Sequence, residues 1–234
     1  MGRCGVTRHL DPEMLLRAYS LGVFPMADNR TAPDVFWVEP QQRGVLPLDA
    51  FHLPRSLAKV LRSERFGITA DRDFAGVVTG CAESVAGRPE TWINPSIAAA
   101  YRALFACGNA HSVECWRDGQ LVGGLYGVKL GAAFFGESMF TRVRDASKCA
   151  LAALVARLSI GGFRLLDTQF LTDHLSQFGT IEVSRAAYKC LLEAALTTSG
   201  DFAAFDWDAA DRSSTTVSGP VSGKRIVQLL TQTS

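Results

Sequence analysis

The chain has 234 residues, 47% of them hydrophobic and 20% charged, which is typical of a soluble globular protein with one or two domains. Its formal net charge of +1 provides no global electrostatic attraction, so contact with a nucleic acid would require a local basic patch. The six cysteines include no C-x-x-C pair and no metal-ligand spacing, which favours a reducing cytoplasm. Neither a secretory signal nor an apolar run of membrane length is recognisable, so a cytoplasmic protein is expected.

The first element is predicted to be a helix in LDPEMLLRAYSLG. Asp11 is a favourable N-cap, Pro12 suits the first helical position, and Gly22 follows the helix end. VFPMADNRTAPD is rich in turn formers, and FWVEPQQRGVLPL predicts short extended pieces broken by prolines. These segments indicate a small N-terminal domain, residues 1–40, followed by a larger domain, residues 41–197.

The next elements alternate between helices and strands. LPRSLAKVLRSERF predicts a basic helix in which Arg55, Lys59 and Arg62 lie near one face. FGITAD predicts a strand, and DRDFAGVVTGCAES and NPSIAAAYRALFACG predict two helices. HSVECWRDGQLVGGLYGVKLGAAFFGESMF then predicts three antiparallel strands, joined by a DG turn and by a second turn at a glycine.

The remaining pattern completes a mixed sheet. RDASKCALAALVARLSIGG predicts a long helix, FRLLDTQF a strand, and LTDHLSQFG and SRAAYKCLLEAAL two more helices. Residues 198–234 are small and polar, which predicts a loosely ordered C-terminal tail. A meander followed by a helix and a strand predicts an α+β fold with a mixed sheet, in the element order of the GCN5-related acetyltransferase fold.

Polar side chains interrupt two of the predicted apolar strands, Glu137 in one and Asp167 with Gln169 in the other. A right-handed crossover through the intervening helix would bring these three residues together, and polar partners would offset the cost of burying a charge. A solvated Glu137 and a helix-capping Asp167 are the alternatives. Strand alternation predicts that Phe135, Glu137 and Met139 share one face. The opposite face would carry Phe134, Gly136, Ser138 and Phe140.

The turn FTRVRDASK lacks the Gly-rich sequence with which acetyltransferases hold the pyrophosphate of coenzyme A. It carries Arg142, Arg144 and Lys148, so the following helix N-terminus suits a nucleic-acid phosphate or is a solvated basic turn. No nucleophile elbow, Walker loop or H-E-x-x-H motif is present, and His111 and His174 are interpreted as structural.

Six segments occur in a specific order: AYSLGVFPM, FWVEPQQRGVLPL, TWINPSIAAAYRALFACGNAHSVECW, LVGGLYGV, FFGESMFTRVRDASKCAL and LLDTQFLTDHLSQFG. Over about Asp11 to Leu196 the chain resembles the bacterial leucyl/phenylalanyl-tRNA–protein transferases. The resemblance implies an acetyltransferase-like domain that uses Leu-tRNA and Phe-tRNA in place of coenzyme A, without a cofactor. It implies transfer of Leu or Phe to the α-amino group of proteins with N-terminal Arg or Lys, which creates an N-degron for regulated proteolysis under the N-end rule.

The resemblance also assigns roles to individual residues. It implies that Asp167 and Gln169 form a relay and that Glu137 orients an amino group. An aminoacyl ester is already activated and an α-amino group has a pKa of about 8, so positioning and a modest base suffice. Whether Asp167 accepts the proton or only aligns groups stays open. Phe134 and Met139 are candidates for the apolar pocket that holds the aminoacyl side chain.

The tRNA contacts follow from the same resemblance. Trp92 matches a family tryptophan that lies against the terminal adenosine, although a core position is the alternative. Many family members have a tryptophan where this chain has Met26, so a flexible thioether replaces an aromatic platform there. The implied backbone contacts are Arg55, Lys59 and Arg62 on the basic helix, with Arg142, Arg144 and Lys148 on the basic turn.

Two other functions compete with this hypothesis. A coenzyme-A-dependent N-acetyltransferase of the same fold is opposed by the missing Gly-rich turn. A non-catalytic RNA-binding module would leave Glu137, Asp167 and Gln169 unexplained. The chain is expected to act as a monomer and without a membrane.

Overall fold

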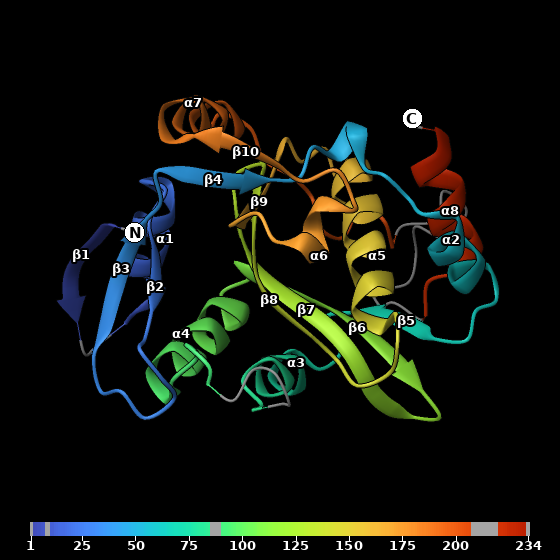
Figure 1. The fold of residues 1–234 in the computed structure, drawn as a ribbon, viewed down its shortest axis with the longest axis horizontal. Helices are drawn as coiled ribbons and strands as arrows, with labels where there is room; N and C mark the ends of the chain where they lie inside the picture. Colours follow the sequence, from blue (N-terminus) through green and yellow to red (C-terminus); the bar gives the residue numbers. More distant parts are fainter. Residues whose placement is uncertain (1, 8–9, 85–89, 207–219, 233–234) are drawn as a thin grey trace.

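The structure is a computed structural model. It describes residues 2–7, 10–84, 90–206 and 220–232. Figure 1 shows a small sheet at one end of the molecule and a large sheet, flanked by helices, across the rest.

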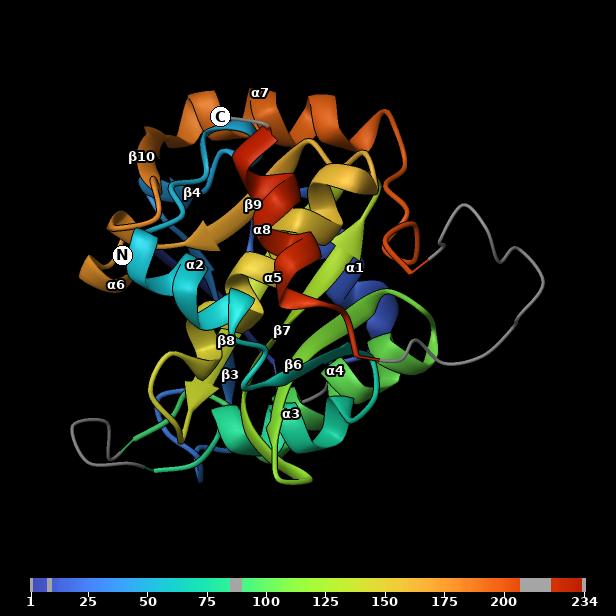
Figure 2. The same cartoon turned by 90° about the vertical axis from the view of Figure 1, so that its right-hand side faces the viewer.

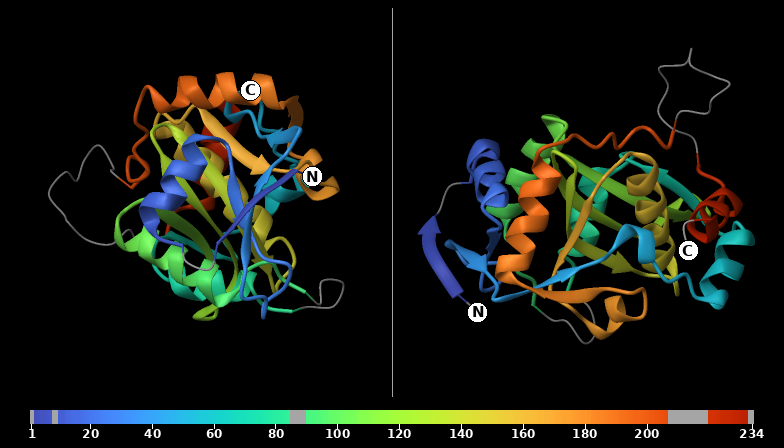
Figure 3. Two further views of the ribbon diagram at one scale, coloured as in Figure 1. Left: turned by 90° about the vertical axis from the view of Figure 1, so that its left-hand side faces the viewer. Right: turned by 90° about the horizontal axis from the view of Figure 1, so that it is seen from above.

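The small sheet is antiparallel and contains β1 (Gly2–Thr7), β3 (Val35–Glu39) and β2 (Phe24–Met26) in that order. Before β2 lies α1 (Pro12–Ser20), which begins as predicted. Asp11 is its N-cap, and the Asp11 carboxylate accepts a hydrogen bond of 2.8 Å from the Met14 N–H. The left panel of Figure 3 shows α1 packed beside the small sheet, next to α4 (Pro95–Ala106).

The large sheet has seven strands in the order β10-β4-β9-β8-β7-β6-β5. Its neighbouring strands pair antiparallel, except that β8 and β9 are parallel, so the predicted mixed sheet and α+β class are confirmed. The strands are β4 (Gln42–Val45), β5 (Gly67–Ala70), β6 (Ala110–Arg117), β7 (Gln120–Leu130), β8 (Ala133–Thr141), β9 (Leu165–Gln169) and β10 (Ile181–Ser184).

Helices cover both faces of this sheet (Figure 2). One apolar cluster lies under α2 (Arg55–Arg62), α5 (Ala146–Ile160) and α8 (Gly223–Gln232), close to the short turn η1 (Leu48–Ala50). The other lies under α1, α3 (Phe74–Cys81), α4 and α7 (Arg185–Leu196). A short helix, α6 (Asp173–Ser176), follows β9. None of the helices in the described residues is long and apolar enough to span a membrane.

The parallel pair formed by β8 and β9 is short. The strands pair only from Ala133 with Leu165 to Phe135 with Asp167, although each strand continues beyond these residues. Past this point β8 stays paired with β7, and β9 stays paired with β4. The sheet therefore opens at the carboxyl ends of its two parallel strands.

A β-bulge in β8 changes the side-chain alternation at this opening. Tyr126 pairs with Ser138 and Gly127 with Gly136, so Glu137 is the extra residue. An extra residue shifts the alternation of the strand beyond it. Met139 accordingly packs with the cluster under α5, together with Phe134, whereas Phe135 and Phe140 belong to the opposite cluster. The prediction that Phe135, Glu137 and Met139 share one face is therefore wrong for Met139.

The described part of the C-terminal segment differs from the predicted loose tail. Helix α8 packs against α2 and α5, because Ile226, Val227 and Leu230 recur at helical spacing and are buried. A turn before it is held by the buried Arg157 of α5, which pairs with Asp206. Residues 207–219 of the predicted tail lie outside the described residues.

Candidate active site

A pocket of about 290 Å³ occupies the opening between β8 and β9. The apolar part of its lining, here called the floor, comes from β7, β8, β9, α5 and α6 and includes Leu125, Met139, Leu151, Leu154, Leu166 and Leu175. The polar part of its lining, here called the rim, includes Glu137, Ser138, Thr168, Gln169, Thr172 and His174. The pocket therefore combines space for an apolar group with polar partners in the same lining.

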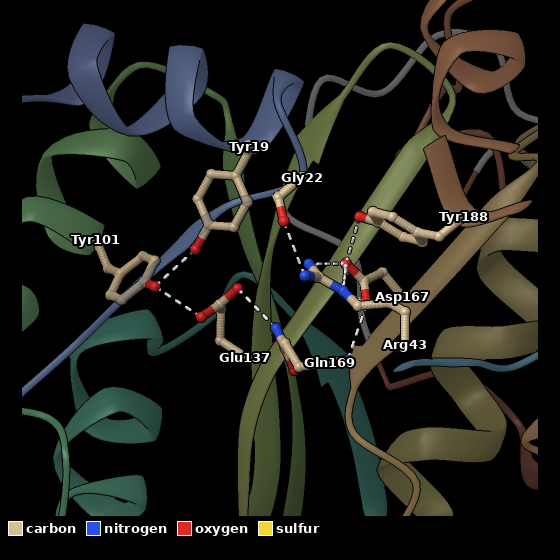
Figure 4. A network of polar contacts seen from close by, with 8 residues as sticks. All are labelled: Tyr19, Gly22, Arg43, Tyr101, Glu137, Asp167, Gln169 and Tyr188. Carbon is tan, nitrogen blue, oxygen red and sulfur yellow. Dashed lines mark hydrogen bonds and ion pairs between the residues drawn. The ribbon is translucent and has the colours of Figure 1, made fainter. Parts of the chain in front are cut away.

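Glu137 lines this pocket and is buried. Figure 4 shows its polar contacts. The Tyr101 hydroxyl donates to Oε2 at 2.6 Å, and the Gln169 side-chain amide donates to Oε1 at 3.0 Å. The hydroxyl of Tyr19, on α1, lies 2.7 Å from that of Tyr101, on α4. Helices on the face opposite α5 thus hold one carboxylate oxygen, and the end of β9 holds the other.

Burial raises the pKa of Glu137 to about 7. Hydrogen bonds from Tyr101 and Tyr19 and the charge of Arg43 lower this pKa, whereas the charge of Asp167 raises it. Burial and the neighbouring carboxylate raise the pKa values of Tyr19 and Tyr101 well above their ordinary value, so both phenols stay neutral hydrogen-bond donors. Glu137 consequently changes charge near neutral pH, where an amine substrate also titrates.

Asp167 lies in β9 and is completely buried. Its Oδ2 is 2.6 Å from Nη2 of Arg43 and also accepts a hydrogen bond of 2.8 Å from the Tyr188 hydroxyl. Burial alone would lower the pKa of Arg43, but the charge of Asp167 raises it above its ordinary value. The pair is a buried, bidentate ion pair, a geometry that satisfies both charged groups.

Gln169 connects these two carboxylates. Its backbone N–H donates to Oδ1 of Asp167 at 2.8 Å, while its side-chain amide reaches Glu137. Its φ of 58° lies in the left-handed region, which is unusual for a residue with a Cβ. The predicted grouping of Glu137, Asp167 and Gln169 is therefore present, but Asp167 faces Arg43 and is not part of the pocket lining.

The two candidates for the aminoacyl pocket, Phe134 and Met139, differ in their position relative to the pocket. Met139 lines the pocket. Phe134 is fully buried and packs against the rings of Phe163 and Phe202, with centroid distances of 6.3 and 5.7 Å, and it is not part of the pocket lining. His174, whose sequence context predicts a structural role, lines the pocket. Burial and the charge of Lys148 lower its pKa.

The two candidates for the tRNA 3′ end lie on adjoining segments. The Ala27 N–H, next to Met26, donates to the Trp92 carbonyl at 3.3 Å. Both Met26 and Trp92 are partly buried against the same apolar cluster. Each side chain therefore contributes to the core and is partly accessible.

The basic candidates differ in their surroundings. Arg55, Lys59 and Arg62 are exposed on α2, opposite its buried face, as predicted. On the turn before α5, Arg142 pairs with Glu83. The remaining two, Arg144 and Lys148, lie 3.8 and 3.9 Å from the carboxylate of Asp145, the N-cap residue of α5. A carboxylate at this helix N-terminus reduces its attraction for a phosphate.

Arg43, Tyr188, Tyr19 and Tyr101 were not predicted from the sequence. Arg43 and Asp167 are separated by 124 residues, so no local pattern connects them. The tyrosines follow the apolar periodicity of their helices, which conceals the role of their hydroxyl groups. Among the described residues, no group of three His, Cys, Asp or Glu side chains could hold a metal ion.

Comparison with known proteins identifies the family of the chain. The model of the family "Leucyl/phenylalanyl-tRNA protein transferase" matches residues 45–193, and that of its N-terminal domain matches residues 8–41. The chain is 59% identical over 245 residues to the leucyl/phenylalanyl-tRNA–protein transferase of Rhizorhabdus wittichii, covering 96% of this chain and 99% of the relative. It is 56% identical over 208 residues to that of Zymomonas mobilis (88% and 78%) and 60% identical over 195 residues to that of Ruegeria pomeroyi (83% and 91%). The chain therefore belongs to the leucyl/phenylalanyl-tRNA–protein transferase family of aminoacyltransferases.

Proposed function

We propose that the chain transfers Leu or Phe from Leu-tRNA or Phe-tRNA to the α-amino group of proteins with N-terminal Arg or Lys, and so marks them for degradation. Family membership over nearly the whole chain supports the transfer reaction. The observation that carries the proposal within the structure is the pocket, where an apolar floor meets the buried carboxylate of Glu137.

The pocket floor holds the apolar aminoacyl side chain, and Met139 and the neighbouring leucines supply its walls. Phe134 supports this wall from the core. Burying a Leu or Phe side chain is favourable by about 1.5–3 kcal/mol, which helps to fix the ester near the polar rim. The ester is activated, so the main requirement is to hold it next to the acceptor amine.

The reaction consumes one acceptor ammonium and one aminoacyl ester. The ammonium loses one proton to the base, and its nitrogen attacks the ester carbonyl. The C–N bond forms as the ester C–O bond breaks, and a second proton from the nitrogen passes to the tRNA 3′-oxygen, which leaves as a hydroxyl. Glu137 suits the proton acceptor because its pKa of about 7 lies close to that of an α-amino group. Asp167 aligns Gln169 and does not take this proton, because its carboxylate already pairs with Arg43 and accepts a hydrogen bond from Tyr188.

The tRNA lies across the small sheet and the α2 side of the large sheet. Trp92 and Met26 flank the terminal adenosine. Arg55, Lys59 and Arg62 contact acceptor-stem phosphates and give a sequence-independent, salt-sensitive affinity. The basic turn with Arg142, Arg144 and Lys148 contributes less, because Glu83 and Asp145 lie beside these cations.

The larger domain, residues 41–197, is of the GCN5-related acetyltransferase-like type, and residues 1–40 form the small N-terminal domain. The parallel strands β8 and β9, which separate around a pocket and are joined by α5, support this relationship. Coenzyme A is not the expected donor, because the N-terminus of α5 offers Asp145 and no Gly-rich turn. A cytoplasmic, monomeric protein is part of this proposal.

The test uses purified protein, Leu-tRNA or Phe-tRNA, and peptides that begin with Arg, Lys, Asp or Ala. Acetyl-coenzyme A replaces the tRNA in a parallel reaction, and mass spectrometry reads the peptide N-terminus. The expected product is Leu or Phe on the Arg and Lys peptides alone. Acetylated peptides, or unmodified peptides with a folded protein, would overturn the proposed donor.

A further inference from the structure

The carboxylate of Asp167 has no free hydrogen-bonding capacity (Figure 4). Arg43 donates through Nε to Oδ1 at 2.9 Å and through Nη2 to Oδ2 at 2.6 Å. The Tyr188 hydroxyl and the Gln169 backbone N–H each add a hydrogen bond of 2.8 Å. A carboxylate offers about four lone-pair sites, so these donors fill it. Asp167 is therefore a fixed anion, enclosed by side chains of β4 and α7.

The end of β9 adopts a constrained conformation next to this anion. Gln169 has a left-handed backbone, which is unfavourable for a residue with a Cβ and persists only where the surroundings enforce it. The Phe170 N–H donates to the Thr168 carbonyl at 2.6 Å, which closes a tight turn. Gly44 of β4 pairs with Gln169, and a Cβ at Gly44 would lie 2.6 Å from the Phe170 carbonyl carbon.

This conformation determines where the Gln169 side chain lies. With its backbone N–H bound to Asp167, Gln169 directs its amide to Glu137 at 3.0 Å. The contact joins the buried ion pair to the carboxylate in the pocket. A shift of the Asp167 carboxylate would therefore move both the Gln169 amide and the orientation of Glu137.

Arg43 also connects this strand end to the N-terminal segment. Its Nη1 donates to the Gly22 carbonyl at 2.9 Å. The guanidinium lies over the rings of Phe24 and Tyr188, 4.8 and 4.5 Å from their centroids. A lysine in place of Arg43 would retain the charge but could not reproduce this planar set of contacts.

We propose that Arg43 and Tyr188 are positioning residues for aminoacyl transfer: together they immobilise Asp167, and Asp167 holds Gln169 in the left-handed conformation that directs its amide to Glu137. This inference rests on the proposed function. It assigns the two residues an effect on the chemical step and none on the binding of tRNA.

Arg43→Lys and Tyr188→Phe test the proposal in steady-state transfer assays with Leu-tRNA and an Arg-peptide. Misplacement of reacting groups by about 1 Å costs about 100-fold in rate, so Arg43→Lys should lower kcat by about 100-fold. Tyr188→Phe keeps the ring over Arg43 and removes one hydrogen bond, so it should cause a smaller loss of kcat. The KM for Leu-tRNA and its Kd should stay at the wild-type values in both variants.

Arg157→Lys is the matched control. Arg157 is also a buried arginine that makes a bidentate pair with a carboxylate, Asp206, and lies over two aromatic rings. Its partners lie in the segment after α7, and neither Arg157 nor Asp206 lines the pocket. Arg157→Lys should lower the melting temperature and leave kcat at the wild-type value.

Two results would overturn the inference, provided that the wild type is active. One is a wild-type kcat in both Tyr188→Phe and folded Arg43→Lys. The other is a loss of kcat in Arg157→Lys as large as that in Arg43→Lys. If Arg43→Lys does not fold, Tyr188→Phe alone decides, because its loss of kcat supports the proposal and its full activity contradicts it. An inactive wild type with every donor would instead contradict the proposed function.

Discussion

Burial of Glu137 raises its pKa and so makes the stability of the protein depend on pH. Its pKa in the folded protein, about 7, lies above the ordinary value of 4.5, so the folded state binds a proton more tightly than the unfolded chain does. The associated stability is complete below about pH 4.5 and is lost as the pH rises through 7. Ionisation of the buried Glu137 carboxylate near neutral pH therefore lowers the free energy of unfolding relative to its value at acidic pH.

Glu137→Gln should remove this pH dependence. Relative to wild type, the free energy of unfolding of the variant should increase by up to about 3 kcal/mol between pH 4.5 and pH 8, because a neutral amide has no charge to bury. Urea unfolding at both pH values measures the difference. Glu182→Gln removes an exposed glutamate of β10 and is the control. A difference that does not change with pH would show that Glu137 does not titrate as described.

The pocket also predicts how donors are distinguished. Apolar pockets separate similar apolar side chains by only about 10- to 200-fold. Because leucines and the flexible Met139 line this pocket, Met-tRNA should be a weak but measurable donor. Competition between Met-tRNA and Leu-tRNA, read by mass spectrometry of the peptide, gives the ratio. Absence of Met transfer above background would contradict this description of the pocket.

Helix α2 presents three cations, Arg55, Lys59 and Arg62, on its exposed face. Each phosphate contact contributes about one unit to the slope of log affinity against log salt concentration. Lys59→Ala should therefore weaken tRNA binding for every sequence and lower this slope by about one. Arg164→Ala is the control, since Arg164 is exposed just before β9, at the end of the strand away from the pocket. An unchanged slope in Lys59→Ala would show that Lys59 of α2 does not contact a tRNA phosphate.

Helix α8 gives a further prediction, for stability. Ile226 is completely buried, so Ile226→Ala should lower the free energy of unfolding by about 2–5 kcal/mol. Gln228→Ala changes an exposed position of the same helix and should have little effect. Urea unfolding curves of the two variants measure this. Equal stability of Ile226→Ala and wild type would favour the loosely ordered tail expected from the sequence.

These elements also show what the sequence could predict. Asp11 and Pro12 marked the start of α1, and the apolar pattern located the strands of the meander. The amphipathic pattern of α8 was present but was concealed by the polar composition around it. The bulge at Glu137 left no local signal, because it depends on how β8 pairs with β7. Without it, Met139 was assigned to the wrong face.

Segments that are far apart in the sequence form the site. Apolar periodicity and resemblance identified Glu137, Asp167 and Gln169, but the groups that fix them come from elsewhere in the chain. Tyr19 reaches the site from α1, and Arg43 reaches it from β4 (Figure 4). Such long-range pairing depends on tertiary packing, so the sequence indicated the acidic residues without their partners.

Helix α1 and the large sheet therefore hold one site together, and the proposed function gives Glu137 a part in the transfer step. The most direct measurement is the single-turnover rate of Leu transfer to an Arg-peptide by wild type and Glu137→Gln, with tRNA affinity measured in parallel. General acid–base contributions are typically about 100-fold or more, so the variant should lose at least that factor while its Kd for Leu-tRNA is unchanged. Transfer by Glu137→Gln at the wild-type rate would contradict the role of the buried carboxylate.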